Sequence, residues 1–248
     1  MTQDAPATDA GLQISGLVRR FGRKQVVAGV DLQVPPGQLV GLLGPNGAGK
    51  TTIFRMIVGL LRPDSGRVFL DGRDLTALPI HRRAQLGLGY LAQAPSVFTR
   101  MTVRDNLLAA LELRGRRGRE AGEVASRFLA EFGLEEVADR SAGRLSGGER
   151  RRTEIARALC AEPSVLILDE PFAAIDPRMA AEIGRIVRDL RARGLGLLLT
   201  DHGARQLLPL CDQVAVLLDG AVVARGSAEE IVADPVVRER YLGRDFTV

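Results

Sequence analysis

The chain has 248 residues, of which 46% are hydrophobic and 26% charged, and its formal net charge is +4. These values are typical of a globular protein with one large core, and the positive residues are spread along the chain, which argues against a nucleic-acid binder. The sequence has no apolar run near the roughly 20 residues of a membrane span and no signal peptide in residues 1–10. Its two cysteines, Cys160 and Cys211, stand in apolar runs that favour core packing in a reducing compartment.

The first third of the chain predicts a small antiparallel sheet and one buried strand. Residues 11–18 and 26–34 have the pattern of short strands joined in a hairpin. Residues 38–43 form a continuous apolar run, which is typical of a strand buried on both faces. We expect a helix over residues 51–61 and a second hairpin over residues 66–75 with Asp-Gly at its turn.

The middle of the chain, about residues 95–160, predicts a helical insert. Thr102 is suited to cap a helix whose apolar residues follow at helical spacing, and a second helix is expected over residues 120–132, ended by Gly133. The arginine-rich residues 114–119 between them indicate a solvated connector.

After the insert, strand and helix patterns alternate. Strands are expected at residues 165–169, 195–200 and 214–218, and a helix at residues 177–191. This alternation predicts an α/β fold with a mostly parallel sheet and helices on both faces.

A phosphate-binding loop follows the first buried strand, in the sequence Gly44-Pro45-Asn46-Gly47-Ala48-Gly49-Lys50-Thr51-Thr52. Glycines let successive backbone N–H groups point at phosphate oxygens, while the lysine reaches the β- and γ-phosphates and the hydroxyl of Thr51 binds Mg²⁺. A Gly-rich turn alone is the alternative, but the loop stands between a strand and a helix as phosphate binding requires. The pattern predicts a site for ATP and Mg²⁺.

Two carboxylates end the predicted strand at residues 165–169, at Asp169 and Glu170. Such acids are often solvated loop residues, yet a strand buried on both faces delivers them to the edge where parallel sheets bind ligands. We therefore assign Asp169 to Mg²⁺, through water, and Glu170 to the general base that orients an attacking water.

A second glycine turn, Leu145-Ser146-Gly147-Gly148-Glu149, opens a helix predicted to run to about Cys160. Ser146 and Glu149 have the spacing of a capping box, so the turn could simply be a well-capped helix start. Its occurrence with a phosphate loop and an acid pair indicates a further phosphate contact.

Together these motifs resemble the ATP-binding-cassette ATPases over essentially the whole chain. The resemblance implies a single nucleotide-binding domain over residues 1–248. Its fold would be α/β, a P-loop NTPase (RecA-like) core with an N-terminal antiparallel β subdomain and a helical subdomain inserted before the glycine turn at 145–149, called the signature motif. It also implies a head-to-tail homodimer that buries two ATP molecules.

The resemblance implies roles for further residues. Ser146, Gly147 and Gly148 would contact the partner's nucleotide, and Asp176 would lie in the loop that crosses the dimer. Phe21 takes the place of the aromatic ring that stacks on adenine, although a hydrophobic contact at a strand end explains it almost as well.

Two more residues complete the implied catalytic set. Gln93 matches the residue that senses Mg²⁺ and contacts a membrane partner, and His202, after the strand at 195–200, matches the γ-phosphate switch. The catalytic residues expected are therefore Glu170, His202, Gln93 and Lys50, and the metal site is expected at Thr51, Gln93 and Asp169.

Within the family, several stretches resemble the ATPases of lipopolysaccharide exporters: residues 41–52, 145–159, 169–177, 194–202 and the tail at 241–246. The ATPases of branched-chain amino acid importers are the alternative, and a non-transport ATPase of the family is an alternative of another class. A permease would dock near Gln93, at Phe98 and Met101, which could otherwise be core residues. We expect a cytoplasmic protein, peripheral on the inner face of the inner membrane, with no nucleic-acid partner.

Overall fold

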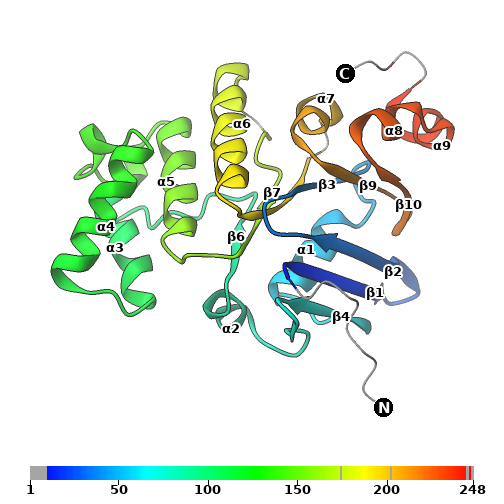
Figure 1. The fold of residues 1–248 in the computed structure, drawn as a ribbon, viewed down its shortest axis with the longest axis horizontal. Helices are drawn as coiled ribbons and strands as arrows, with labels where there is room; N and C mark the ends of the chain where they lie inside the picture. The colour runs from blue at the N-terminus through cyan, green and yellow to red at the C-terminus, as the bar shows by residue number, and fades with distance from the viewer. Residues whose placement is uncertain (1–9, 174, 202, 244–245, 247–248) are drawn as a thin grey trace.

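The computed structural model describes residues 10–173, 175–201, 203–243 and 246. Two β-sheets and the helices around them form one end of the molecule, and a group of helices forms the other (Figure 1). This arrangement confirms the predicted fold class: a mostly parallel α/β core, an N-terminal antiparallel part and an inserted helical part.

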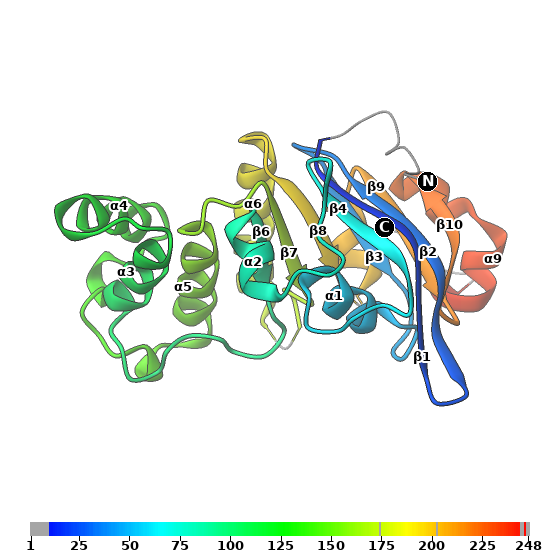
Figure 2. The ribbon, with the colours of Figure 1, turned by 90° about the horizontal axis from the view of Figure 1, so that it is seen from below.

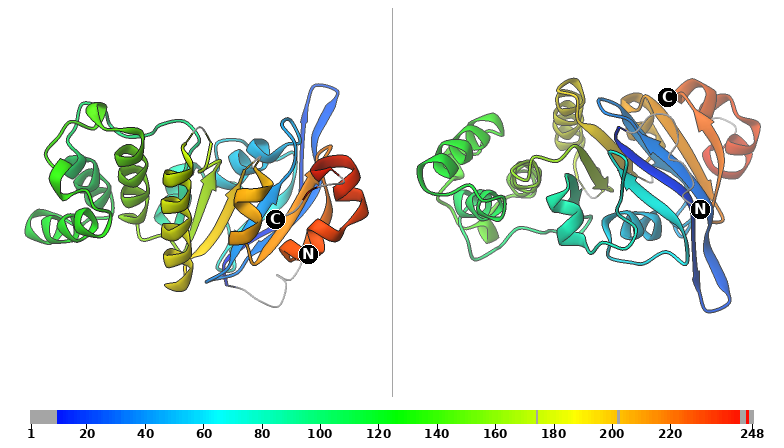
Figure 3. Two further views of the ribbon diagram at one scale, coloured as in Figure 1. Left: turned by 90° about the horizontal axis from the view of Figure 1, so that it is seen from above. Right: turned by 60° about the horizontal axis from the view of Figure 1, so that its bottom comes forward.

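The antiparallel sheet has four strands in the order β2-β1-β4-β5. They are β1 (Leu12–Phe21), β2 (Lys24–Val34), β4 (Ser65–Leu70) and β5 (Arg73–Asp74). The β1–β2 hairpin is longer than the sequence pattern predicted, and its turn end projects from the body of the protein (Figures 2 and 3).

The larger sheet has six strands in the order β10-β9-β3-β8-β7-β6. The strands are β3 (Leu39–Leu43), β6 (Leu88–Leu91), β7 (Val165–Asp169), β8 (Gly196–Thr200), β9 (Gln213–Leu218) and β10 (Ala221–Gly226). All neighbours pair in parallel except β9 and β10. The sequence pattern did not predict β6 and β10, because β6 is short and β10 is an edge strand without a continuous apolar run.

Both faces of the parallel strands are buried, which explains their continuous apolar runs. On β3, Leu42 packs into the core between the two sheets, whereas Leu43 packs into the core on the opposite face. Helix α1 (Lys50–Val58) lies in the core between the sheets and buries Phe54 and Ile57 there. The opposite face is covered by helices that include α6 (Pro177–Ala192) and α7 (Ala204–Leu207).

The helical part contains α3 (Val103–Leu113), α4 (Gly118–Glu131) and α5 (Gly147–Leu159). Thr102 caps α3 as predicted, and its side chain accepts a hydrogen bond from the Asp105 backbone N–H at 3.0 Å. The remaining helices are α2 (Ile80–Gln85), α8 (Ala228–Ala233) and α9 (Pro235–Val237), with short turns η1 (Glu135–Val137), η2 (Ala142–Arg144), η3 (Leu208–Leu210) and η4 (Arg238–Leu242).

Among the residues that the structure describes, none of the helices combines the length and the apolar character that crossing a bilayer requires. Cys160 is buried, as its apolar neighbours predicted, and burial raises the pKa of its thiol to about 12.

Candidate nucleotide site

The phosphate loop leaves the carboxyl end of β3 and enters α1 at Lys50. The residue before the helix, Gly49, has a left-handed backbone with φ 111°, and no side chain caps the helix start. The first N–H groups of an α-helix have no partner within the helix and carry partial positive charge. This helix start is therefore suited to receive an anion.

The loop is too tightly packed for side chains at its ends. At Gly44, with φ 152°, a Cβ atom would lie 2.2 Å from the backbone oxygen of Leu217. At Gly49 it would lie 2.7 Å from the backbone oxygen of Val26. The predicted glycines are thus required by the contacts of the loop with β9 and β2.

The Lys50 side chain turns back over the loop. Its Nζ donates to the carbonyl oxygens of Gly44 at 2.5 Å and Pro45 at 3.0 Å. Burial lowers the pKa of the Lys50 ammonium, and the carboxylates of Glu170, Asp201 and Asp169 oppose that shift. The ammonium therefore lies near three carboxylates beside the loop.

A small cavity of about 220 Å³ opens between the loop and the carboxylate strand. It is lined by Val26, Asn46, Gly47, Gly49, Lys50, Thr51, Thr52 and Glu170. The structure thus brings the predicted loop and the predicted general base together, with backbone N–H groups, an ammonium, hydroxyls and a carboxylate around one space.

Asp169 is the last residue of β7 and is only 2% exposed. Its carboxylate accepts hydrogen bonds from the Thr200 hydroxyl at 2.9 Å and from the Tyr90 hydroxyl at 3.4 Å. Burial raises the pKa of Asp169, and the hydrogen bonds from Thr200 and Tyr90 oppose the shift. Burial, together with the charge of the Asp169 carboxylate, raises the pKa of the Tyr90 hydroxyl to about 12. These neighbours hold the carboxylate in one orientation.

Glu170 follows at a sharp turn of the chain, with φ 47°. This left-handed backbone is unusual for a residue with a side chain and is typical of functional sites. The Glu170 N–H donates to the Thr200 carbonyl oxygen at 3.0 Å, and its Oε2 accepts from Gln93 Nε2 at 2.8 Å. Gln93 and Glu170, which are 77 residues apart, therefore meet at the edge of the cavity.

Asp201 is a site residue that the sequence reasoning missed. It follows β8 and is buried, with its two carboxylate oxygens accepting from the backbone N–H groups of Gly203 at 2.8 Å and Phe172 at 3.3 Å. Its place directly after a buried strand was the signal that could have found it. Its neighbour His202 lies outside the described residues.

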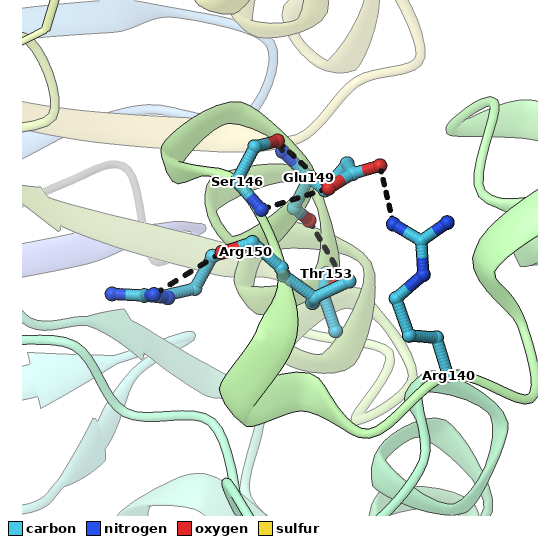
Figure 4. Close-up of polar contacts among 6 residues, drawn as sticks. Arg140, Ser146, Glu149, Arg150 and Thr153 are labelled. Atoms are coloured by element: carbon cyan, nitrogen blue, oxygen red, sulfur yellow. Dashed lines mark hydrogen bonds and ion pairs between the residues drawn. The ribbon is translucent and has the colours of Figure 1, made fainter.

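The signature turn caps α5 with its own side chains (Figure 4). The Ser146 N–H and hydroxyl both donate to Glu149 Oε2 at 2.8 Å, and the Glu149 N–H donates to the Ser146 hydroxyl at 3.3 Å. Arg140 adds a 3.4 Å contact to the same carboxylate. Hydrogen bonds from Ser146 lower the pKa of Glu149.

The signature turn contributes no residue to the lining of the phosphate-loop cavity. A Cβ at Gly147 would meet nothing within 4 Å, so this face of the turn is open, whereas one at Gly148 would lie 2.0 Å from Met179 Cε on α6. Asp176 caps α6, since its carboxylate accepts from the Met179 N–H at 2.9 Å. The structure thus supports structural roles for Ser146 and Asp176 within the chain.

The residues predicted to stack on adenine or to dock a permease are exposed or half-buried. Phe21 is 49% exposed near the turn of the β1–β2 hairpin, with the Arg19 guanidinium 5.0 Å from the ring centre, and it does not line the cavity. Phe98 is 52% exposed and Met101 half-buried, so neither is a core residue. The Arg157 guanidinium lies 4.9 Å from the Phe98 ring centre.

A phosphate loop between a buried strand and a helix, beside acids that end the neighbouring parallel strands, defines a P-loop nucleoside triphosphatase. Residues 27–173 match the family model described as "ABC transporter". The chain therefore belongs to the ABC transporter family and is one of its ATPases.

The most informative relatives cover nearly the whole chain. It is 53% identical over 237 residues to the "Lipopolysaccharide export system ATP-binding protein LptB" of Acidithiobacillus ferridurans, covering 96% of this chain and 98% of that protein. The protein of that name from Escherichia coli K12 is 45% identical over 238 residues, covering 96% and 99%. A solved ATP-binding cassette of an ABC transporter in its ADP conformation superposes with a TM-score of 0.84 at 30% identity, covering 94% and 98%.

Proposed function

We propose that the chain is the ATP-hydrolysing subunit of a lipopolysaccharide exporter, peripheral on the cytoplasmic face of the inner membrane. We assign this cargo because relatives named as lipopolysaccharide export ATP-binding proteins are 45–53% identical to the chain over nearly their full length. No observation favours an amino acid importer or a non-transport ATPase. The observation that carries the ATPase activity is the meeting of Lys50, Glu170 and Gln93 around the phosphate-loop cavity.

The residues fit ATP with Mg²⁺. The Lys50 ammonium now bonds to loop carbonyls, and phosphate oxygens would replace them as acceptors. Thr51, Asp169 and Gln93 would hold Mg²⁺ through the oxygen ligands that this ion prefers, Asp169 through water. Bound there, the ion would neutralise negative charge on the phosphates. Phe21 at the hairpin end would stack on adenine.

Glu170 acts on the attacking water. The turn at φ 47° aims its side chain at the cavity, and the hydrogen bond from Gln93 fixes one carboxylate oxygen. In the proposed mechanism the Glu170 carboxylate accepts a proton from, and orients, a water in line with the γ-phosphate. His202, which lies outside the described residues, would contact that phosphate.

The complete site needs a second copy. Ser146, Gly147 and Gly148 do not line the cavity of their own chain, while the face of Gly147 is open. In a head-to-tail homodimer this open helix start would meet the partner's γ-phosphate, and the loop with Asp176 would cross the interface. A helix N-terminus supplies N–H groups and positive potential to such an anion.

The dimer is tested by a pair of matched cap variants. Ser227 caps α8 with the same capping box as Ser146, donating its N–H to Glu230 and accepting from the Glu230 N–H at 3.3 Å, although its hydroxyl donates to Glu229. Ser146→Ala and Ser227→Ala should each cost about 1 kcal/mol of stability. Only Ser146→Ala should lower turnover, and wild-type turnover per chain should fall on dilution. Turnover per chain that stays constant on dilution and is unchanged in Ser146→Ala would refute the dimer.

The permease contact is tested at Phe98, on the exposed surface that also carries Met101. Phe98→Asp should reduce co-purification of a multi-span permease from detergent-solubilised membranes, because exposed aromatic side chains dominate such contacts. Leu113 on α3 is 82% exposed and serves as the control, since Leu113→Asp should leave the complex intact. An unchanged complex with Phe98→Asp would remove this surface from the proposal. Recovered lipopolysaccharide with the permease would support the cargo.

A further inference from the structure

The loop that carries Gln93, residues 92–98, is attached to one face of helix α5. We call it the Gln93 loop. Arg151 Nη1 donates to the Ala92 carbonyl oxygen at 3.3 Å, and Arg157 Nη2 donates to the Ser96 hydroxyl at 2.8 Å. The Ser96 backbone N–H donates to Glu154 Oε1 at 2.7 Å. The position of Gln93 therefore depends on where α5 lies.

Glu154 is at the centre of these contacts. It is only 3% exposed, and its second oxygen accepts from Arg151 Nη1 at 3.1 Å. Arg151, Glu154 and Arg157 are spaced three residues apart, which places them on one face of the helix. The Glu154 carboxylate also opposes the lowering of the Arg157 pKa that burial causes. One buried acid thus bonds to the Arg151 guanidinium and to the loop backbone, and it acts electrostatically on the Arg157 guanidinium.

The same helix begins with the signature turn. Its first residues are capped by Ser146, two turns before Glu154, and its central face holds the Gln93 loop. At the far end of that loop, Gln93 donates to Glu170 at 2.8 Å. A chain of contacts therefore runs from the signature turn through Glu154 and Gln93 to the proposed general base.

We propose that Glu154 is a positioning residue for ATP hydrolysis, which holds Gln93 against Glu170 and makes that contact respond to the position of α5. The proposal rests on the proposed ATPase activity of the site. Glu154 does not touch nucleotide or water itself. Without the Glu154 carboxylate, the Ser96 N–H loses its acceptor, and the Gln93 loop is no longer fixed in its position on α5.

The test is a double-mutant cycle between Glu154 and Gln93 in the full-length protein. Glu154→Met keeps the side-chain volume and removes the acceptor, and should lower kcat about tenfold with little change in the KM for ATP. In the Gln93→Ala background the same change should alter kcat by less than about twofold, because residues that act as one unit are not additive. Glu154→Gln keeps an acceptor for Ser96 and should restore kcat to within about threefold of wild type.

A separate ion pair of α5 provides the control. Arg152 contacts Glu182 on α6 at 2.7 Å, away from the Gln93 loop. Glu182→Gln should show no coupling to Gln93→Ala in the same cycle. Glu154→Met should also raise the Mg²⁺ concentration for half-maximal turnover, because Gln93 is a proposed metal ligand, and Glu182→Gln should not.

The outcomes separate this proposal from the function on which it rests. If the kcat losses of Glu154→Met and Gln93→Ala multiply, or if Glu154→Met lowers only the melting temperature, the positioning role is wrong. Should Glu154→Met fail to fold, Glu154→Ala takes its place in the cycle, and its loss of kcat must likewise vanish in the Gln93→Ala background. Near-normal turnover by Glu170→Gln would instead refute the assignment of the active site.

Discussion

Two helices of this protein begin with glycine turns, and the structure treats their first turns in opposite ways. Helix α1 begins at Lys50 with a left-handed glycine and no side-chain cap. Helix α5 begins at Gly147 with a complete capping box from Ser146 and Glu149. The first start lacks side-chain partners for its N–H groups, and the second supplies its own.

This difference indicates which of the two helix starts can bind phosphate in the isolated chain. An uncapped helix start beside an ammonium is ready for an anion, so the α1 loop is suited to hold nucleotide alone. The α5 start is stable without ligand, and the Ser146 hydroxyl must exchange its bond to Glu149 to reach a partner's phosphate. The predictions below test this division between binding and closure.

The largest effect is expected at the general base. Glu170→Gln should keep the hydrogen bond to Gln93 and leave nucleotide binding at the α1 loop intact, because the amide is isosteric. Turnover should fall by about 10²–10⁴, since the variant lacks the basic oxygen. The measurements are steady-state kcat and the melting-temperature shift caused by ATP. A variant that hydrolyses ATP at a near-normal rate would show that another group orients the water.

The opposite end of α1 is expected to control stability. Arg83 is 2% exposed, and its guanidinium donates to backbone oxygens that include Met56 and Thr76, at 2.7 and 3.0 Å. Arg83→Met leaves these buried acceptors without partners and should cost about 3 kcal/mol or more. Arg82, which is exposed and lies on α2 with Arg83, is the control, and Arg82→Met is expected to change stability by less than about 0.5 kcal/mol. Equal denaturation midpoints for both variants would contradict this account of α1.

The sequence predicted the parts of the site that lie within one local pattern. The phosphate loop and the acids at 169–170 could be predicted because a buried strand directly precedes each. The cap of α5 was predictable for the same reason, since Ser146 and Glu149 interact within one turn.

What the sequence could not predict depends on contacts between distant segments. The bond between Gln93 and Glu170 and the burial of Arg83 over the end of α1 join separate elements. Asp201 carries no motif of its own and becomes a site residue because β8 lies beside β7 in the sheet. Local periodicity also cannot detect β6, whose Gly89 packs against Leu166 and Pro163 rather than adding an apolar side chain.

A smaller effect is expected from Asp169, and it depends on pH. Because burial raises the pKa of Asp169 above its ordinary value of 3.8, the folded protein holds a proton there more tightly than the unfolded chain. The wild type should therefore match Asp169→Asn below that value and become less stable as pH rises through the folded-state pKa. At neutral pH the variant should therefore be more stable than the wild type and lose Mg²⁺-dependent turnover.

The measurement is chemical denaturation of both proteins without nucleotide between pH 3 and 8. A stability difference at Asp169 that is constant with pH would mean that packing, rather than ionisation, distinguishes the variant.

The smallest expected change separates the two helix starts most sharply. A Cβ at Gly147 meets nothing within 4 Å in the single chain, so Gly147→Ala should keep the stability of the chain or raise it by up to about 1 kcal/mol. In the proposed dimer the methyl group would occupy the space of the partner's γ-phosphate, and turnover should fall about tenfold, or about 1.4 kcal/mol. Gly148→Ala is the contrast, because its Cβ would lie 2.0 Å from Met179 Cε and the flexible Met179 side chain on α6 would have to move to make room for it. Unchanged turnover in a stable Gly147→Ala protein would mean that the α5 start does not close over a nucleotide, and that the open face at Gly147 serves no partner.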